Sequence, residues 1–167
     1  MQTSKTSIGW LIATGATALV IVAAALPPVL DDPASGLLHH AFSSICHQLP
    51  ERSIHVDGRA VALCHRCTGM LLGLWAGLFS AIGLRPIGSA GRSALEDVRS
   101  SRQGLWLVVF LVPTAIDWAL GAGGVWANTP ISRMLTGAVF GAAAGLILAA
   151  NLLAPRPRPD LVPTHAV

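Results

Sequence analysis

The sequence has few charged residues. Lys, Arg, Asp and Glu make up 11% of the 167 residues, whereas apolar residues make up 53%, and the mean hydropathy is +0.62. Charged residues are commonly about a quarter of a soluble domain. The composition therefore excludes an ordinary soluble domain and predicts a protein that lies in a membrane.

Motifs of several enzyme classes are also absent. The chain has no glycine-rich nucleotide-binding loop, no Ser-His-Asp order and no haem-attachment motif. Its net charge of +3 is explained by an uneven distribution of basic residues across a membrane, so it does not indicate a nucleic-acid partner. Nothing in the sequence selects an enzyme over a binding protein.

Four apolar runs cover residues 8–30, 68–84, 104–123 and 134–154. Each is near the roughly 20 residues that cross about 30 Å of hydrocarbon as a helix. We therefore expect an all-α membrane protein with four transmembrane helices in a single domain over residues 1–154. A cleaved signal peptide is the alternative for the first run, although its apolar core of about 19 residues exceeds the usual 7 to 15. Trp10, near the start of this run, is expected at the membrane interface.

The orientation follows from the basic residues, which are more frequent in cytoplasmic loops. A cytoplasmic N-terminus places most of them inside a cell (inner) membrane and residues 31–67 outside it. Both termini are then cytoplasmic, and the proline-rich tail over residues 155–167 is expected to be disordered. The inner segments hold Lys5, Arg85, Arg92, Arg99, Arg102, Arg156 and Arg158, and the outer segments hold Arg52, Arg59, Arg66 and Arg133.

The external segment begins with a predicted helix. Apolar residues recur at helical spacing after Asp32-Pro33, with Asp32 expected as the N-cap and Pro33 at the first helical position. A short amphipathic helix on the outer surface of the cell membrane would follow, ending before Pro50. The apolar positions are Leu37, Leu38, Ala41, Phe42 and Ile45.

A hairpin is predicted next. Asp57-Gly58 lies between two short runs of β-prone residues, a pattern typical of a two-residue hairpin turn. The alternative is an ordinary loop turn. A hairpin would fold the chain back and bring Cys64 near Cys46.

Two of the apolar runs share a glycine motif. Residues 68–78 and 136–146 both read Thr-Gly-x-x-x-Gly-x-x-x-Gly-Leu. Glycines four residues apart form a smooth groove that lets membrane helices approach closely. The repetition indicates either an internal duplication of two helical hairpins or a coincidence in glycine-rich helices.

The cysteines predict a metal site. Cys64 and Cys67 form a Cys-x-x-Cys pair, and Cys46 precedes them across the predicted hairpin. Two thiolates at this spacing can bind one Zn²⁺ ion, which usually takes four ligands. We therefore predict zinc bound by Cys46, Cys64, Cys67 and one histidine, for which His47 is chosen, with His39 and His55 as alternatives.

Oxidation is the competing prediction for the three cysteines. In an oxidising compartment they can form one disulfide and leave one thiol. Cys64 with Cys67 would form a redox-active pair, whereas Cys46 with either would staple the loop. Simple packing without chemistry is the remaining alternative.

Asp117 is the other residue that stands out. A carboxylate at the centre of a membrane helix costs about 2.5–3.5 kcal/mol on insertion scales, and it normally faces the bundle interior. Arg66 and Arg133 belong to the same outer leaflet and are expected partners. Asp117, Arg133 and Arg66 are therefore candidate catalytic or transport residues, with Asp117 as base, proton carrier or cation site. A salt bridge that only fixes packing is the alternative. Trp118, Trp126 and Asn128 are expected to line or border this patch.

Several motifs together resemble a known family, the small prokaryotic membrane proteins catalogued as domain of unknown function 2085. The resemblance spans about residues 46–145 and implies a multi-pass membrane protein without implying an activity. One position departs from it, since Trp118 follows Asp117 where the family usually has glycine. The motifs are Cys46-His47-Gln48, Pro50-Glu51-Arg52-Ser53, Cys64-x-Arg66-Cys67-Thr68-Gly69, Pro113 with Asp117, and Arg133 with Thr136-Gly137.

Two classes of function follow from these residues. In the first, the protein is a binding or transport module for a metal ion or small solute, with the zinc site lying over the polar patch. In the second, it is a membrane enzyme. That enzyme is either a thiol-disulfide oxidoreductase using Cys64 and Cys67 or an enzyme acting on lipid phosphates held by Arg52, Arg66 and Arg133. The lipid bilayer is the expected partner in both, and no oligomeric state is predicted.

Overall fold

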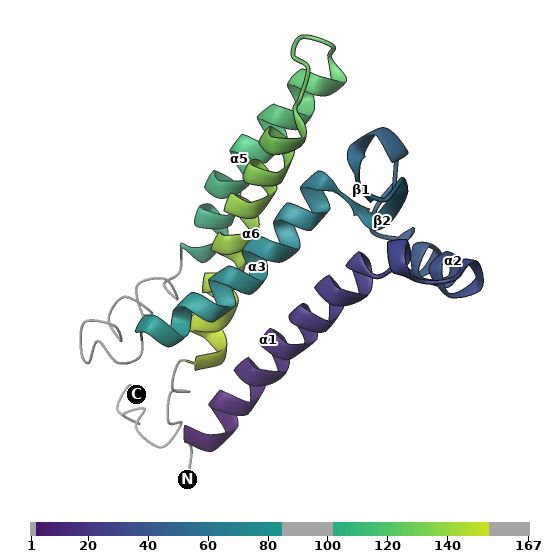
Figure 1. The fold of residues 1–167 in the computed structure, drawn as a ribbon. Helices are drawn as coiled ribbons and strands as arrows, with labels where there is room; N and C mark the ends of the chain where they lie inside the picture. The colour runs from purple at the N-terminus through teal and green to yellow at the C-terminus, as the bar shows by residue number, and fades with distance from the viewer. Residues whose placement is uncertain (1–2, 85–101, 154–167) are drawn as a thin grey trace, which may run out of the picture.

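The computed structural model describes residues 3–84 and 102–153 and is mostly helical (Figure 1). The tail predicted over residues 155–167 lies outside the described residues. The long helices are α1 (Thr3–Ala25), α3 (His65–Leu84), α5 (Gln103–Ala122) and α6 (Pro130–Leu153). Between α1 and α3 lie the short 3-10 helix η1 (Pro27–Val29), α2 (Asp32–Phe42), the 3-10 helix η2 (Pro50–Arg52), and the strands β1 (Ser53–Val56) and β2 (Arg59–Cys64).

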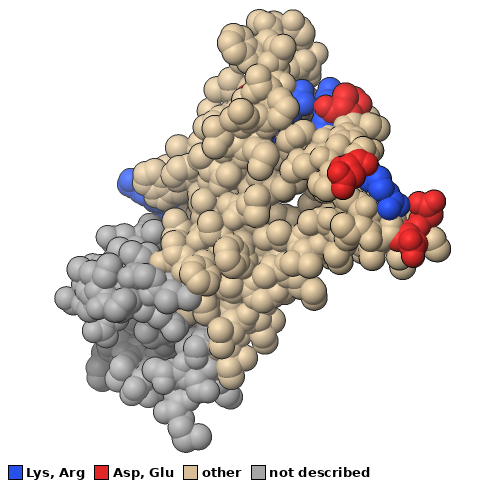
Figure 2. Space-filling view, viewed as in Figure 1, with Lys and Arg blue, Asp and Glu red and all other residues tan. Residues whose placement is uncertain are grey.

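Within residues 3–84 and 102–153, three helical segments are long and apolar enough to cross a membrane: Ile8–Ala25 of α1, α5 and α6. Many of their large apolar side chains are exposed, as at Leu11, Leu19 and Val108. On the face seen in Figure 2, charged residues gather mainly over the end that carries α2 and the two strands. Because an exposed apolar belt is unfavourable in water, this distribution indicates that these three segments lie in lipid.

The two glycine motifs face each other. Equivalent positions of α3 and α6 pair in increasing order, so the helices run in the same direction, side by side (Figure 1). A Cβ atom added at any of the six glycines would lie less than 3.0 Å from a backbone oxygen of the other helix. The predicted smooth grooves are therefore in contact. The glycines are Gly69, Gly73 and Gly77 of α3 and Gly137, Gly141 and Gly145 of α6.

The other two long helices pack against this pair. Trp10 of α1 is only 6% exposed, and its Nε1–H donates a hydrogen bond of 2.8 Å to the carbonyl oxygen of Leu78 in α3. The indole therefore finds a backbone acceptor inside the bundle, and its expected position at the membrane interface stays a prediction. The Thr114 hydroxyl of α5 donates to the Thr136 carbonyl of α6 at 2.8 Å.

The predicted hairpin is confirmed. Strands β1 and β2 pair antiparallel with Val56 opposite Arg59, so the turn consists of Asp57 and Gly58. Their φ angles of 51° and 77° are the positive values that a tight hairpin turn of this length requires. Aspartate and glycine tolerate this conformation better than most residues, which explains why the dipeptide was informative.

The start of α2 differs from the prediction by one residue. Asp31 occupies the N-cap with extended backbone angles, and Asp32 is already helical. The Asp31 side chain forms no capping hydrogen bond, so Asp31 is the N-cap by its backbone conformation. Of the predicted apolar face, Phe42 is buried while Leu37 and Ile45 are exposed.

We predict opposite effects for two Gly→Ala substitutions. Gly73→Ala adds a Cβ that overlaps the backbone of Ala138, so it should lower stability by roughly 1–3 kcal/mol. Gly15→Ala, on an open face of α1, should be neutral or stabilising, because alanine has the higher helix propensity. Thermal unfolding of both variants in detergent checks this, and equal midpoints would contradict the α3–α6 contact.

Candidate functional site

The three cysteines lie together at the point where β2 meets α3. Their sulfur atoms all lie within 4.8 Å of one another, and all three are free thiols. The backbone N–H of Cys64 donates to the Cys46 sulfur at 3.3 Å. Cys46 is buried, and Cys64 and Cys67 are half-buried. The hairpin has therefore brought Cys64 to Cys46, as its turn signal predicted.

The end of α2 carries Cys46 into this position. After Phe42 the chain makes a tight turn, and the Cys46 N–H donates to the Phe42 carbonyl at 3.0 Å. Both residues belong to an apolar cluster with Ala62 and Leu63 of β2. Packing of Phe42 and Cys46 against β2 thus fixes the position of the Cys46 sulfur.

Gln48 ties the two sides of the cysteine site together. Its φ of 52° turns the chain sharply, and its side-chain amide donates to the carbonyl of His39 at 2.8 Å and to that of Ala62 at 3.0 Å. One amide thereby joins α2 to β2. This role of Gln48 could not be predicted, because no local sequence signal marks a positive φ at glutamine.

The neighbouring thiols of Cys64 and Cys67 shift each other's pKa in opposite directions. The hydrogen bond from Cys67 lowers the pKa of Cys64 from 9.0 to about 5, and backbone N–H groups of Cys67 and Arg66 add to this effect. The same interaction raises the pKa of Cys67, because its thiol must stay protonated to donate. Backbone N–H groups at the start of a helix stabilise an anion in this way.

The sulfur positions suit a zinc ion. A tetrahedral ion with Zn–S bonds of about 2.3 Å separates its sulfurs by roughly 3.8 Å, and the three sulfurs here lie within 4.8 Å. Among the described residues, Cys46, Cys64 and Cys67 form the group whose ligand atoms lie close enough together to bind one metal ion. His47 is exposed and lines the adjoining pocket, so it lies at the edge of the site and not within it.

The other histidines near the cysteines are engaged with backbone. His65 Nδ1 donates to the Arg52 carbonyl at 2.6 Å, and His55 Nδ1 donates to the Ser53 carbonyl at 3.1 Å. His65 thus connects the start of α3 to η2. This contact positions Arg52 beside the cysteine pocket.

Each carboxylate oxygen of Asp117 accepts a hydrogen bond. Asp117 forms a salt bridge with Arg66, and the two side chains are only 10% and 16% exposed. Its second carboxylate oxygen accepts from the Ser132 hydroxyl at 3.0 Å. Its backbone carbonyl accepts from the side chain of Asn128. Of the two arginines expected as partners, Arg66 is the one paired, and Ser132 is a contact that the sequence analysis did not anticipate.

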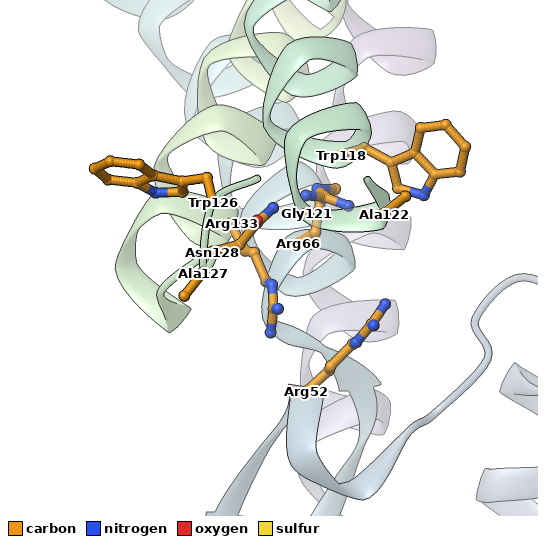
Figure 3. A pocket seen from close by; sticks show the side chains of 9 residues that line it. All are labelled: Arg52, Arg66, Trp118, Gly121, Ala122, Trp126, Ala127, Asn128 and Arg133. Carbon is orange, nitrogen blue, oxygen red and sulfur yellow. The ribbon is translucent and has the colours of Figure 1, made fainter. Parts of the chain in front are cut away.

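Arg133 faces a pocket instead of Asp117. A hollow of about 240 Å³ lies between the last turn of α5 and the first turn of α6. Figure 3 shows the side chains of Arg52 and Arg133 reaching into the same space, with the rings of Trp118 and Trp126 on either side. The lining residues are Arg52, Arg66, Trp118, Gly121, Ala122, Trp126, Ala127, Asn128 and Arg133.

A second pocket, of about 390 Å³, connects this region to the cysteines. It is bordered by all three cysteines and His47, and it shares Arg52, Arg66, Trp118 and Arg133 with the first. The remaining lining residues are Ile45, Gln48 and Leu49. The cysteine site and the polar patch therefore border two adjacent hollows.

Comparisons with known proteins identify the family. Residues 46–147 match the family model described as Predicted membrane protein (DUF2085). An uncharacterized protein of Methanocaldococcus jannaschii is 28% identical over 104 residues, which cover 62% of this chain and 61% of that relative's length. No solved structure matches. Since the family model covers more than half of the sequence, the chain belongs to the family of predicted membrane proteins catalogued as domain of unknown function 2085.

Proposed function

We propose that the protein is a four-span protein of the cell (inner) membrane that binds a zinc ion on the outer side through its three cysteines. The zinc-bound loop covers the polar patch of Asp117, Arg66 and Arg133, and the whole acts as a binding module for a metal ion or small solute. The observation that carries this proposal is the set of three sulfurs within 4.8 Å of one another.

The packing of α3 supports a fourth span. This helix has 20 residues, as many as α5. It lies along α6, a candidate span, with three glycines in backbone contact. A helix in such contact along its length occupies the same depth of the bilayer as its neighbour. Together with α1, α5 and α6, it makes an even number of spans, which puts both ends of the four-span bundle on one side of the membrane. The excess of Lys and Arg in the inner segments favours the cytoplasmic side.

Two features favour a bound ion over a purely packed cysteine cluster. The external segment between α1 and α3 has a small apolar core around Phe42 and Leu63, and a metal ion supplies much of the folding free energy in domains of this size. The pocket beside the sulfurs leaves room for His47 or a water molecule as fourth ligand. A closed site of three thiolates and one histidine is typical of structural zinc.

We predict about one zinc ion per chain and three titratable thiols in wild-type protein expressed without added metal. Cys46→Ser, Cys64→Ser and Cys67→Ser should each lower the zinc content to near zero, because a hydroxyl is a poor zinc ligand. Elemental analysis and a thiol count under denaturing conditions measure both quantities. No metal with a single thiol would mean a disulfide and would overturn the zinc assignment.

His47→Ala tests the fourth ligand within the same experiment. It should weaken zinc binding by about tenfold or more, whereas His40→Ala, at the exposed end of α2, should leave it unchanged. Equal affinities in the two variants would remove His47 from the site and assign the fourth position to water.

We further propose that Asp117 fixes the polar patch and is not the path of a solute. Its carboxylate already accepts hydrogen bonds from Arg66 and Ser132, which leaves it poorly suited to carry a proton or a cation. Its effect is to hold the Arg66 side chain, and with it the start of α3, against α5.

Asp117→Asn should therefore lower stability strongly while zinc content stays at about one per chain. It leaves the largely buried Arg66 without a carboxylate, and breaking a buried pair costs about 3–5 kcal/mol. Asp32→Asn is the matched control, because Asp32 pairs with Arg59 at the surface and exposed pairs contribute little. Thermal unfolding of the two variants makes the comparison, and a mild Asp117→Asn would refute the structural role.

Thiol-disulfide exchange is the second candidate, favoured by the hydrogen bond between Cys64 and Cys67. The Cys64 thiolate would attack a disulfide of a client protein and release one client thiolate. Cys67 would then attack the mixed disulfide, which leaves Cys64 and Cys67 oxidised and the client reduced. This reaction requires the metal-free protein, since zinc would occupy both sulfurs.

In metal-free protein we predict that alkylation of Cys64 by iodoacetamide rises with pH through about 5 and is level by neutral pH. Only the thiolate reacts, and a lowered pKa means that the folded protein stabilises this form, a contribution that is lost as the pH falls through about 5. Cys67→Ala removes the main donor and should shift the profile toward the ordinary value. Mass spectrometry of the Cys64 peptide gives the profile, and a wild-type midpoint near 8.5 would contradict the thiolate.

A further inference from the structure

Two adjacent pockets share three arginines. Both are lined by Arg52, Arg66, Arg133 and Trp118, and we call the two pockets together the arginine cleft. Arg52 comes from η2, Arg66 from the first turn of α3 and Arg133 from the first turn of α6. Figure 3 shows the Arg52 and Arg133 side chains directed into the same opening.

The cleft carries excess positive charge. None of the described residues that line it is acidic. Within the described part of the chain, the salt bridges are Arg59 with Asp32 and Arg66 with Asp117, so Arg52 and Arg133 face the cleft without a carboxylate partner. A zinc ion bound to three thiolates would add a single net negative charge nearby, which still leaves the arginines in excess.

Unused hydrogen-bond donors accompany this charge. A guanidinium has five N–H donors in a fixed fork, and Asp117 takes one amino group of Arg66. The buried Nε of Arg66 has no partner. Three such forks around one hollow match the oxygens of a phosphate group, which arginine binds in bidentate fashion.

The cleft also lies at the depth of lipid headgroups. Trp118 and Trp126 border it and are 60% and 62% exposed, and exposed indoles concentrate at the membrane–water interface. We propose that the arginine cleft binds a phosphate group, carried either by an anionic lipid headgroup or by a soluble phosphate compound. This proposal does not depend on the metal site.

Binding measurements on the full chain in detergent test the proposal. One arm titrates inorganic phosphate and follows the thermal unfolding midpoint. The other adds phosphatidylglycerol to the micelles and counts bound lipid by native mass spectrometry. Arg133→Gln and Arg52→Gln should each weaken binding by about tenfold or more, because each removes a charged hydrogen-bonding group. Arg59→Gln is the matched control, since it removes the same charge outside the cleft, and it should bind like wild type.

The two arms separate the sources of the phosphate. Binding of phosphatidylglycerol alone identifies a headgroup site, whereas binding of inorganic phosphate with displacement of the lipid identifies a site for soluble phosphates. Unfolding midpoints without ligand and zinc content show whether each variant is folded, and Arg52→Lys and Arg133→Lys, which keep the charge but lose the fork, replace any Gln variant that is not. Affinities that are equal in the cleft variants and in Arg59→Gln, or no binding of either probe to wild type, overturn the proposal.

Discussion

The backbone contact between α3 and α6 is the constraint on which the rest of the structure depends. Six glycines let the two helices touch along most of their length, so their relative register is fixed by backbone atoms and not by flexible side chains. Arg66 and Arg133 each stand about one turn before the first glycine of their helix. The contact therefore places both arginines at the same level, where one meets Asp117 and the other faces the cleft.

The junction of β2 with α3 couples the cysteine site to that framework. Cys64 is the last residue of the strand and His65 the first of the helix, so no loop separates them. A sulfur at this junction receives backbone N–H groups from the helix while its strand is held by the hairpin and by Gln48. The metal proposed for the site would thus join the external segment directly to the most tightly packed helix pair.

Local chemistry explains which features could be predicted from the sequence. The Asp57-Gly58 turn, the glycine motifs and the grouping of the cysteines follow from rules that act over a few residues, and each is observed. Contacts between residues that are distant in the sequence were harder to predict. From the sequence, both Arg66 and Arg133 were possible ion-pair partners of Asp117. Only the side-by-side packing of three helices identifies Arg66 as the partner. The burial of Trp10 could not be predicted for a related reason, since its acceptor at Leu78 belongs to another helix.

The interlocked glycines also limit how the bundle can move. Because each glycine accommodates a backbone segment of the opposite helix, a small axial displacement of α3 along α6 would press a neighbouring side chain against that backbone. The next matching register lies four residues away, which is about 6 Å along a helix. Gradual sliding of α3 along α6 is thus suppressed, and the two helices behave as one rigid pair. A change of shape on ligand binding would therefore involve α1, α5 or the external segment more readily than this helix pair.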